Sequence, residues 1–159
     1  MPWQYETRFR SDVGKVLGPG DMPQVRADAL SRVVTVPPVP RAVTAAREWS
    51  RQTIERWRLG EAAEPIEHLV SELVTNSVEH AQCVSVTVLL MYAAGMLRLE
   101  VRDQDTAHVP VQKSPEPGDV DGRGLVIVQA LSDRWGVRVT SSGKTVWCEL
   151  AVPPPGGVG

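Results

Sequence analysis

The chain has 159 residues, of which 42% are hydrophobic and 23% are charged, values typical of one globular domain. Its 17 basic and 19 acidic residues give a formal net charge of −2, which excludes a strongly basic field for direct nucleic-acid binding. Cys83 and Cys148 are too few for a disulfide framework, and no apolar run approaches the roughly 18 residues of a membrane span, so we expect a cytoplasmic protein without a membrane partner.

The prolines divide the chain, because proline is excluded from helix interiors and central strands. Residues 66–109 and 118–152 contain none. We therefore predict an N-terminal extension over residues 1–32 that is partly disordered, a folded domain over 33–152, and a flexible tail over 153–159.

The first half of the predicted domain begins with a short edge strand at 33–36 and a helix from about 40 to 58. A second helix is indicated by apolar residues at helical spacing, with Pro65 at its start. These residues are Ile66, Leu69, Val70, Leu73, Val74 and Val78, and Ser77 occupies a further position at the same spacing.

The second half begins with a period of two. Alternating apolar residues over 84–90 and 97–101, with a turn at 93–95, predict a hairpin that has one face against helices. A polar loop at 104–121, a helix at 125–131 and strands at about 135–140 and 145–152 follow. This order predicts an α+β two-layer sandwich, with a mixed, mostly antiparallel sheet covered by helices on one face.

Glu72, Asn76 and Glu79 share one stripe of the second helix, at the border of its apolar face. A solvated flank is one interpretation. Asn is a weak helix former, however, and a carboxylate with an amide oxygen one turn away could hold a hard cation and orient a hydroxyl. Both interpretations remain open on the local pattern.

Asp103 follows Leu97, Leu99 and Val101 at strand spacing, so its carboxylate is expected on the apolar face, where an unpaired charge is costly. In one interpretation the strand ends at Arg102 and Asp103 caps a turn. In the other, Asp103 accepts a hydrogen bond from a ligand donor such as an exocyclic amine.

The 104–121 loop has the length of a lid or a disordered insertion. Directly after it, Gly122-Arg123-Gly124 opens a helix. Glycines at a helix N-terminus let backbone N–H groups approach a phosphate, with Arg123 supplying charge, although a plain glycine hinge has the same pattern.

Taken together and in this order, these segments resemble the GHKL-type ATPases, which have the Bergerat (histidine-kinase-like ATPase) fold. The stretch 72–81, ELVTNSVEHA, is similar to their N-box helix. The turn at Asp103, the run Gly122-Arg123-Gly124-Leu125 and the stretch 143–147 resemble their nucleotide motifs. The run 124–136, GLVIVQALSDRWG, is similar to stand-alone RsbW-like anti-sigma-factor serine kinases.

The resemblance implies ATP and Mg²⁺ as cofactors. It implies that Glu72 is the general base, that Asn76 coordinates Mg²⁺ and that Asp103 accepts from the adenine amino group. Gly122, Arg123 and Gly124 would surround the phosphates. Thr145 would help to hold the adenine edge, a placement that rests on the resemblance alone.

The implied function is an anti-sigma factor that also phosphorylates a serine of an anti-anti-sigma (STAS-type) partner, with a homodimer possible. In the family a glycine normally lies two residues after the motif Asp, and this chain has Asp105 there. A non-catalytic partner-binding module is therefore the alternative. The absence of phosphoacceptor helices in the sequence disfavours the catalytic half of a histidine kinase.

Overall fold

The computed structural model describes residues 29–80, 82–105 and 123–155. Five strands, three α-helices and one short 3-10 helix lie within these ranges. In chain order they are β1 (Leu30–Val36), α2 (Arg41–Arg56), η1 (Gly60–Ala62), α3 (Ala63–His80), β2 (Val86–Ala93), β3 (Met96–Asp103), α4 (Arg123–Leu131), β4 (Arg134–Thr140) and β5 (Gly143–Ala151).

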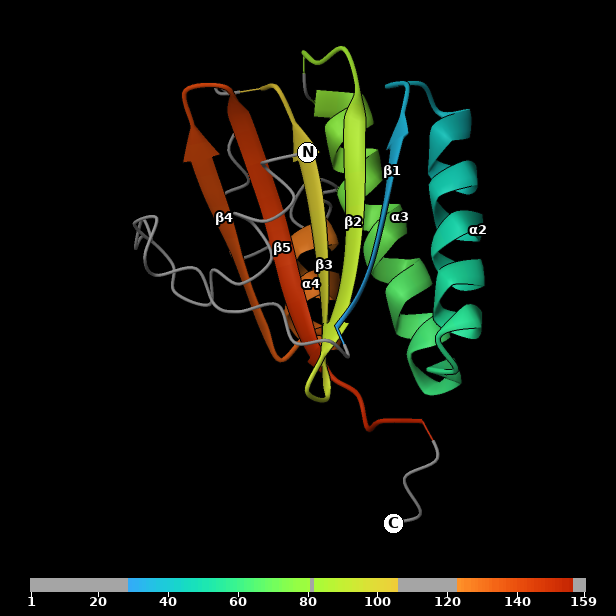
Figure 1. Ribbon diagram of the computed structural model, residues 1–159. Helices are drawn as coiled ribbons and strands as arrows, with labels where there is room; N and C mark the ends of the chain where they lie inside the picture. The colour runs from blue at the N-terminus through green and yellow to red at the C-terminus, as the bar shows by residue number, and fades with distance from the viewer. Residues whose placement is uncertain (1–28, 81, 106–122, 156–159) are drawn as a thin grey trace.

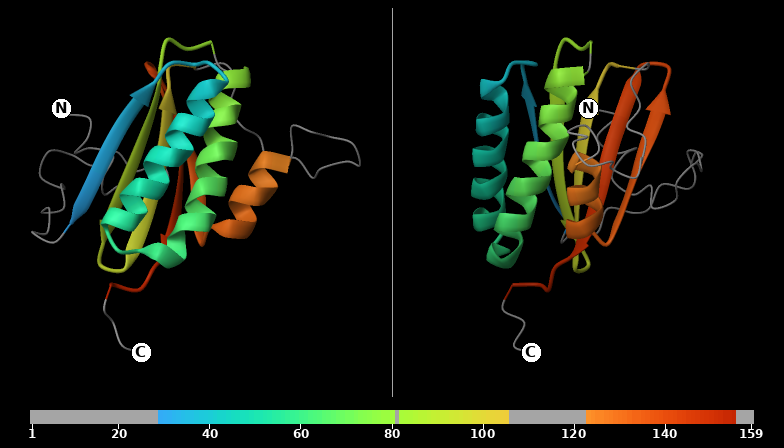
Figure 2. Two further views of the ribbon diagram at one scale, coloured as in Figure 1. Left: turned by 90° about the vertical axis from the view of Figure 1, so that its right-hand side faces the viewer. Right: turned by 180° about the vertical axis from the view of Figure 1, so that it is seen from behind.

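The described strands form one sheet in the order β1-β2-β3-β5-β4, and each of their four pairings is antiparallel. Helices α2, α3 and α4 all cover the same face, as the side and rear views show (Figures 1 and 2). We call the helix-covered face the inner face and the opposite one the outer face. The expected α+β two-layer sandwich with helices on one face is thus confirmed, and its described sheet is antiparallel throughout rather than mixed.

Strand alternation decides which side chains enter the core. Leu97, Leu99 and Val101 of β3 lie on the inner face and are almost fully buried. They pack against α3, whose apolar residues repeat at helical spacing. The apolar face that this period produces on α3 therefore packs the helical layer against the sheet. The α3 residues buried in the core are Ile66, Leu69, Val70, Leu73 and Val74.

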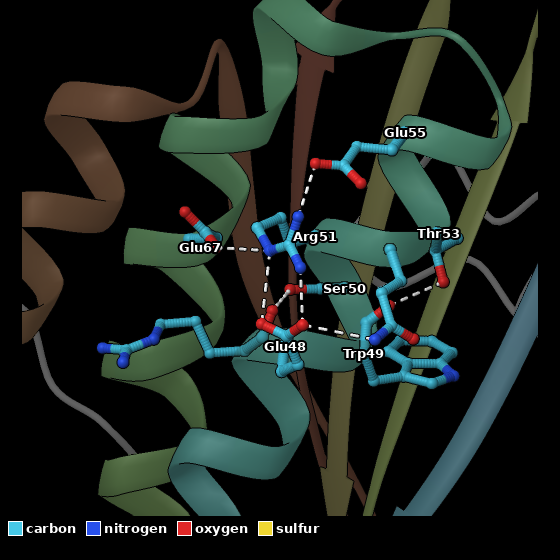
Figure 3. Close-up of polar contacts among 9 residues, drawn as sticks. Glu48, Trp49, Ser50, Arg51, Thr53, Glu55 and Glu67 are labelled. Atoms are coloured by element: carbon cyan, nitrogen blue, oxygen red, sulfur yellow. Dashed lines mark hydrogen bonds and ion pairs between the residues drawn. The ribbon is translucent and has the colours of Figure 1, made fainter.

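Helix α2 is attached to the rest of the helical layer partly through polar contacts. Arg51 contacts Glu48 and Glu55 of its own helix, each at 2.5 Å, and Glu67 of α3 at 3.9 Å (Figure 3). On the other side of α2, Arg32 of β1 donates to Thr53 at 2.9 Å. The Arg51 contacts are solvent-exposed, so burial of the apolar residues of α2 is the larger source of stability.

Two turns need unusual backbone angles. Ala94 and Gly95 both have positive φ (51° and 78°) and connect β2 to β3, as a two-residue hairpin loop requires. Gly143 begins β5 with φ of 149°, and a Cβ there would lie 2.0 Å from the Asp103 carbonyl oxygen. Glycine at 143 therefore allows β5 to approach the end of β3.

Most boundaries differ from the predicted ones by a few residues. Strand β1 begins at Leu30, before the predicted domain boundary at residue 33, and β2 continues to Ala93. Strand β3 continues through Asp103 rather than ending at Arg102. Because β5 supplies a partner for Asp103 at Lys144, the ladder continues past the last apolar residue of β3.

Candidate functional site

The end of β3 places a carboxylate inside the protein. Asp103 is 1% exposed and lies on the inner face, as its strand parity predicts. A buried carboxylate must be compensated by hydrogen bonds or an opposite charge. The groups around Asp103 therefore define the candidate site.

Three groups from three segments surround the Asp103 carboxylate. Ser77 of α3 donates its hydroxyl to Oδ2 at 2.7 Å, and the Asp105 backbone N–H donates to Oδ1 at 3.0 Å. The Lys144 ammonium lies 3.6 Å from Oδ2. Each carboxylate oxygen has two lone pairs, so these two hydrogen bonds leave one acceptor position on each oxygen for a further donor.

Lys144 also lies 3.9 Å from the Asp105 carboxylate. Lys144 and Asp105 are 4% and 5% exposed, so both charges are inside the protein. We call Asp103, Asp105 and Lys144 the inner cluster. Asp105 points inward and not to solvent, which makes the residue at the usual glycine position part of the site.

Glu72 and Asn76 lie one turn apart on α3, and both are half-buried, whereas Glu79 on the same stripe is exposed. Ser77, the next residue after Asn76, is bonded to Asp103. The Ser77–Asp103 hydrogen bond thus holds the part of α3 that carries Asn76 next to the end of β3. The stripe predicted from sequence is divided by burial, with Glu72 and Asn76 at the core border and Glu79 in solvent.

Cys83 lies close to the inner cluster, and its thiol is affected by the charges there. Burial, followed by the nearby Asp103 charge, raises the pKa of its thiol, and Lys144 partly opposes the shift. Its sulfur contacts the Ser77 carbonyl at 3.8 Å. The segment between α3 and β2 therefore lies within the electrostatic range of the inner cluster.

The remaining candidate residues are placed less completely. Thr145 lies on the outer face, opposite Arg102 and Arg138, so the register does not bring it to the inner-face side of Asp103. Arg123 and Gly124 begin the backbone of α4, and Gly122 lies outside the described residues. Most of the predicted lid, from 106 onward, lies outside them as well.

Sequence reasoning missed Lys144 and Ser77. Lys144 has the same strand parity as the apolar residues Val146, Cys148 and Leu150. The parity argument that identified Asp103 applies equally to this lysine. Ser77 belongs to the apolar stripe of α3 and carries the one hydroxyl that reaches Asp103.

The oxygen atoms of Asn76 and Asp103 determine which groups the candidate site could hold. Within the described ranges no group of three His, Cys, Asp or Glu residues could hold a metal. Mg²⁺ in nucleotide sites takes one or two protein oxygens and the rest from phosphates and water. The amide oxygen of Asn76 meets that requirement, and the spare acceptor capacity of buried Asp103 suits an amino group.

Within the described part of the chain, no helix is both long enough and apolar enough to cross a bilayer.

Comparison with known proteins agrees with this architecture. Residues 36–150 match the histidine kinase-like ATPase domain family. An uncharacterized protein of Streptomyces coelicolor is 34% identical over 89 residues, which are 54% of this chain and 85% of that protein.

Two solved structures are also similar. The RsbU and RsbW domains of Rv1364c from Mycobacterium tuberculosis superpose with a TM-score of 0.59 at 22% identity, over 79% of this chain and 33% of that one. This chain thus spans about a third of that structure. A histidine kinase domain from Erythrobacter litoralis gives a TM-score of 0.44 at 27% identity, over 58% of this chain and 46% of that one.

Proposed function

We propose, because the chain belongs to the histidine kinase-like ATPase domain family, that it is a cytoplasmic ATP-binding regulator that combines sigma-factor binding with serine kinase activity. Its kinase substrate would be an anti-anti-sigma protein of the STAS type. The similarity of the run 124–136 to RsbW-like proteins supports this choice within the family.

The observation that carries the proposal is the buried Asp103 carboxylate. Its ordered donors, Ser77 and the Asp105 N–H, keep the carboxylate in one orientation. An oriented acceptor in a site shielded from water is suited to an exocyclic amine of a base. We assign Asp103 to adenine recognition on this ground.

Glu72 and Asn76 would act at the other end of the nucleotide. In the proposed reaction a serine oxygen of the partner forms a bond to the γ-phosphorus, the bond to the bridging oxygen of ADP breaks, and Glu72 accepts the serine proton. Asn76 would hold Mg²⁺, which when bound neutralises phosphate charge. Glu72 is half-buried, so it can be reached from outside.

Gly122, Arg123 and Gly124 complete the proposed site. Backbone N–H groups at the start of α4 would bind phosphate oxygens, with Arg123 supplying charge. These three assignments follow from the family motifs. Thr145 is left out of the proposed site, because the strand register places it on the outer face.

A phosphotransfer assay with matched glutamates tests the catalytic part. Wild type with Mg-ATP should transfer the γ-phosphate to a serine-bearing STAS protein, and Glu72→Gln should lower the rate by about 10²–10⁴-fold. Glu79→Gln, on the same stripe but exposed, should leave it unchanged. Equal rates for Glu72→Gln and wild type would remove Glu72 from the base role.

One observation favours a second candidate, a partner-binding module without kinase activity. Asp105 is buried beside Lys144 at the position where a glycine normally gives the base room. Calorimetry of ATP binding, together with the phosphotransfer assay, separates the two candidates. Tight ATP binding with phosphate transfer supports the kinase, binding without transfer supports the module, and no binding of ATP contradicts both nucleotide roles.

A further inference from the structure

The outer face of the sheet is buried although every described helix lies on the other side (Figure 2). Leu89 and Met91 of β2 and Trp147 of β5 are only 3%, 6% and 4% exposed. A sheet face open to water would leave such large side chains well exposed. Something other than the described elements therefore covers this face.

The polar residues of the outer face form a network of their own, which we call the outer cluster: Arg98, Glu100 and Glu149. Arg98 donates to Glu100 at 2.8 Å and to Glu149 at 2.7 Å, and its guanidinium lies 4.3 Å from the centre of the Trp147 ring. Gly136 provides the space for that ring, because a Cβ there would lie 2.7 Å from it.

The outer cluster has one unmet requirement. Nη2 of Arg98 is buried and finds no hydrogen-bond partner among the described residues. An unsatisfied buried donor costs free energy, so an acceptor is expected in whatever lies above it. The covering element must therefore bring both apolar surface and an oxygen acceptor.

We propose that the outer face is the docking surface for the N-terminal segment of the same chain, residues 1–28. This segment enters the sheet at β1, whose first residue Leu30 pairs with Tyr92 at an edge. An extended chain spans about 3.3 Å per residue, and neighbouring strands are about 4.8 Å apart. Fewer than half of the residues of this segment are therefore enough to reach across the width of the sheet.

The composition of the segment fits the surface. Trp3, Tyr5 and Phe9 are close together in the sequence, and Phe9 is the only Phe of the chain. Aromatic side chains can cover Leu89 and Met91, and backbone carbonyls can accept from Arg98. Segment 106–122 is a poorer occupant, since it joins the inner cluster to α4 on the helix side, and 156–159 is short.

Photo-cross-linking in the full-length chain tests this placement. With Phe9→p-benzoylphenylalanine, illumination should give cross-links from position 9 to outer-face residues, Met91 among them, and a mixture of isotopically heavy and light protein should show them within single chains. Placing the same photoreactive residue at Val84, which is 83% exposed, is the control and should not label the outer face.

Methionine oxidation provides a second readout. In wild type Met91 should oxidise slowly at every protein concentration. In the triple variant Trp3→Ser, Tyr5→Ser, Phe9→Ser, Met91 should oxidise about tenfold faster, with an unchanged far-UV circular dichroism spectrum as the sign of an intact fold.

Three results would overturn the proposal. Cross-links between heavy and light chains, or protection of Met91 that rises with protein concentration, would assign the face to a second copy. Cross-links from position 9 that avoid the outer face would place the segment elsewhere. Rapid oxidation of Met91 in wild type would mean that the face is open.

Discussion

Strands β3 and β5 carry two buried charge clusters, one on each face of the sheet. The outer cluster lies in the middle of the strands, where Arg98 is opposite Glu149 and Glu100 is opposite Trp147. The inner cluster lies at the strand end, where Asp103 is opposite Lys144 next to α3. The same alternation produces both, and their positions along the strands separate them.

This difference in position indicates a difference in role. Charges in the middle of a ladder, covered on their face, serve mainly to compensate one another, and losing one member removes part of that compensation. Charges at a strand end, with a helix and a loop as neighbours, can exchange a partner for a ligand. We therefore expect substitutions in the outer cluster to change the stability of the fold and substitutions in the inner cluster to change ligand affinity.

The largest effect is expected for Arg98→Met. This change removes the guanidinium that Glu100 and Glu149 share, and with it the contact with the Trp147 ring. We expect a loss of about 3–5 kcal/mol in the free energy of unfolding, measured by urea denaturation. Arg51→Met, which breaks exposed ion pairs, is the control and should stay close to wild type. A loss for Arg98→Met as small as that control would show that the outer cluster is not structural.

Asp103→Asn tests the inner cluster. Loss of a charge-assisted hydrogen bond should weaken ATP binding by about 1.5–3 kcal/mol, or roughly 10–100-fold, measured by calorimetry. Glu72→Gln should have little effect on binding, because Glu72 acts on the nucleophile. Asp133→Asn, an exposed Asp that accepts from Ala151 N–H, is a matched control. Unchanged affinity for Asp103→Asn would separate this carboxylate from the nucleotide.

The ionisation of Cys148 reports whether water reaches the part of β5 that lies between the two clusters. Burial raises the pKa of its thiol to about 12, above the usual value of about 8.5 in an unfolded chain. The folded state therefore keeps a proton that the unfolded state loses. This contribution to stability is complete below pH 8.5 and is lost as pH rises toward 12, by about 1.4 kcal/mol per pH unit.

Denaturation of wild type and Cys148→Ala at several values between pH 8 and 10 isolates this effect. Stability of the wild type should fall more steeply than that of Cys148→Ala over this range. Parallel profiles would mean that the thiol ionises in the folded protein and that water reaches the centre of β5.

The smallest effect concerns Asp105. Replacement by glycine removes a buried negative charge beside the proposed nucleotide and leaves Lys144 to face it. Asp105→Gly should tighten ATP binding by about 1 kcal/mol, or roughly fivefold, and should raise any phosphotransfer rate. Weaker binding would show instead that Asp105 keeps the Lys144 ammonium from pairing more tightly with the Asp103 carboxylate and blocking the ligand there.

Much of the architecture was accessible from local patterns. The helical period of α3, the alternation in β2 and β3 and the order of the elements predicted the two layers, since each pattern reflects one side of an element facing the core. The strand parity of Asp103 predicted its burial. The same parity applied to Lys144 would have identified the inner cluster in part.

The sequence by itself determined which residues face the core, because side-chain direction alternates along a strand and repeats along a helix whatever the partners are. Only the tertiary structure decided which of those residues meet. The register of β3 with β5 pairs Asp103 with Lys144 and Arg98 with Glu149, and α3 brings Ser77 to the same carboxylate. Pairing between residues far apart in the chain depends on strand order and packing, so no local period contains it.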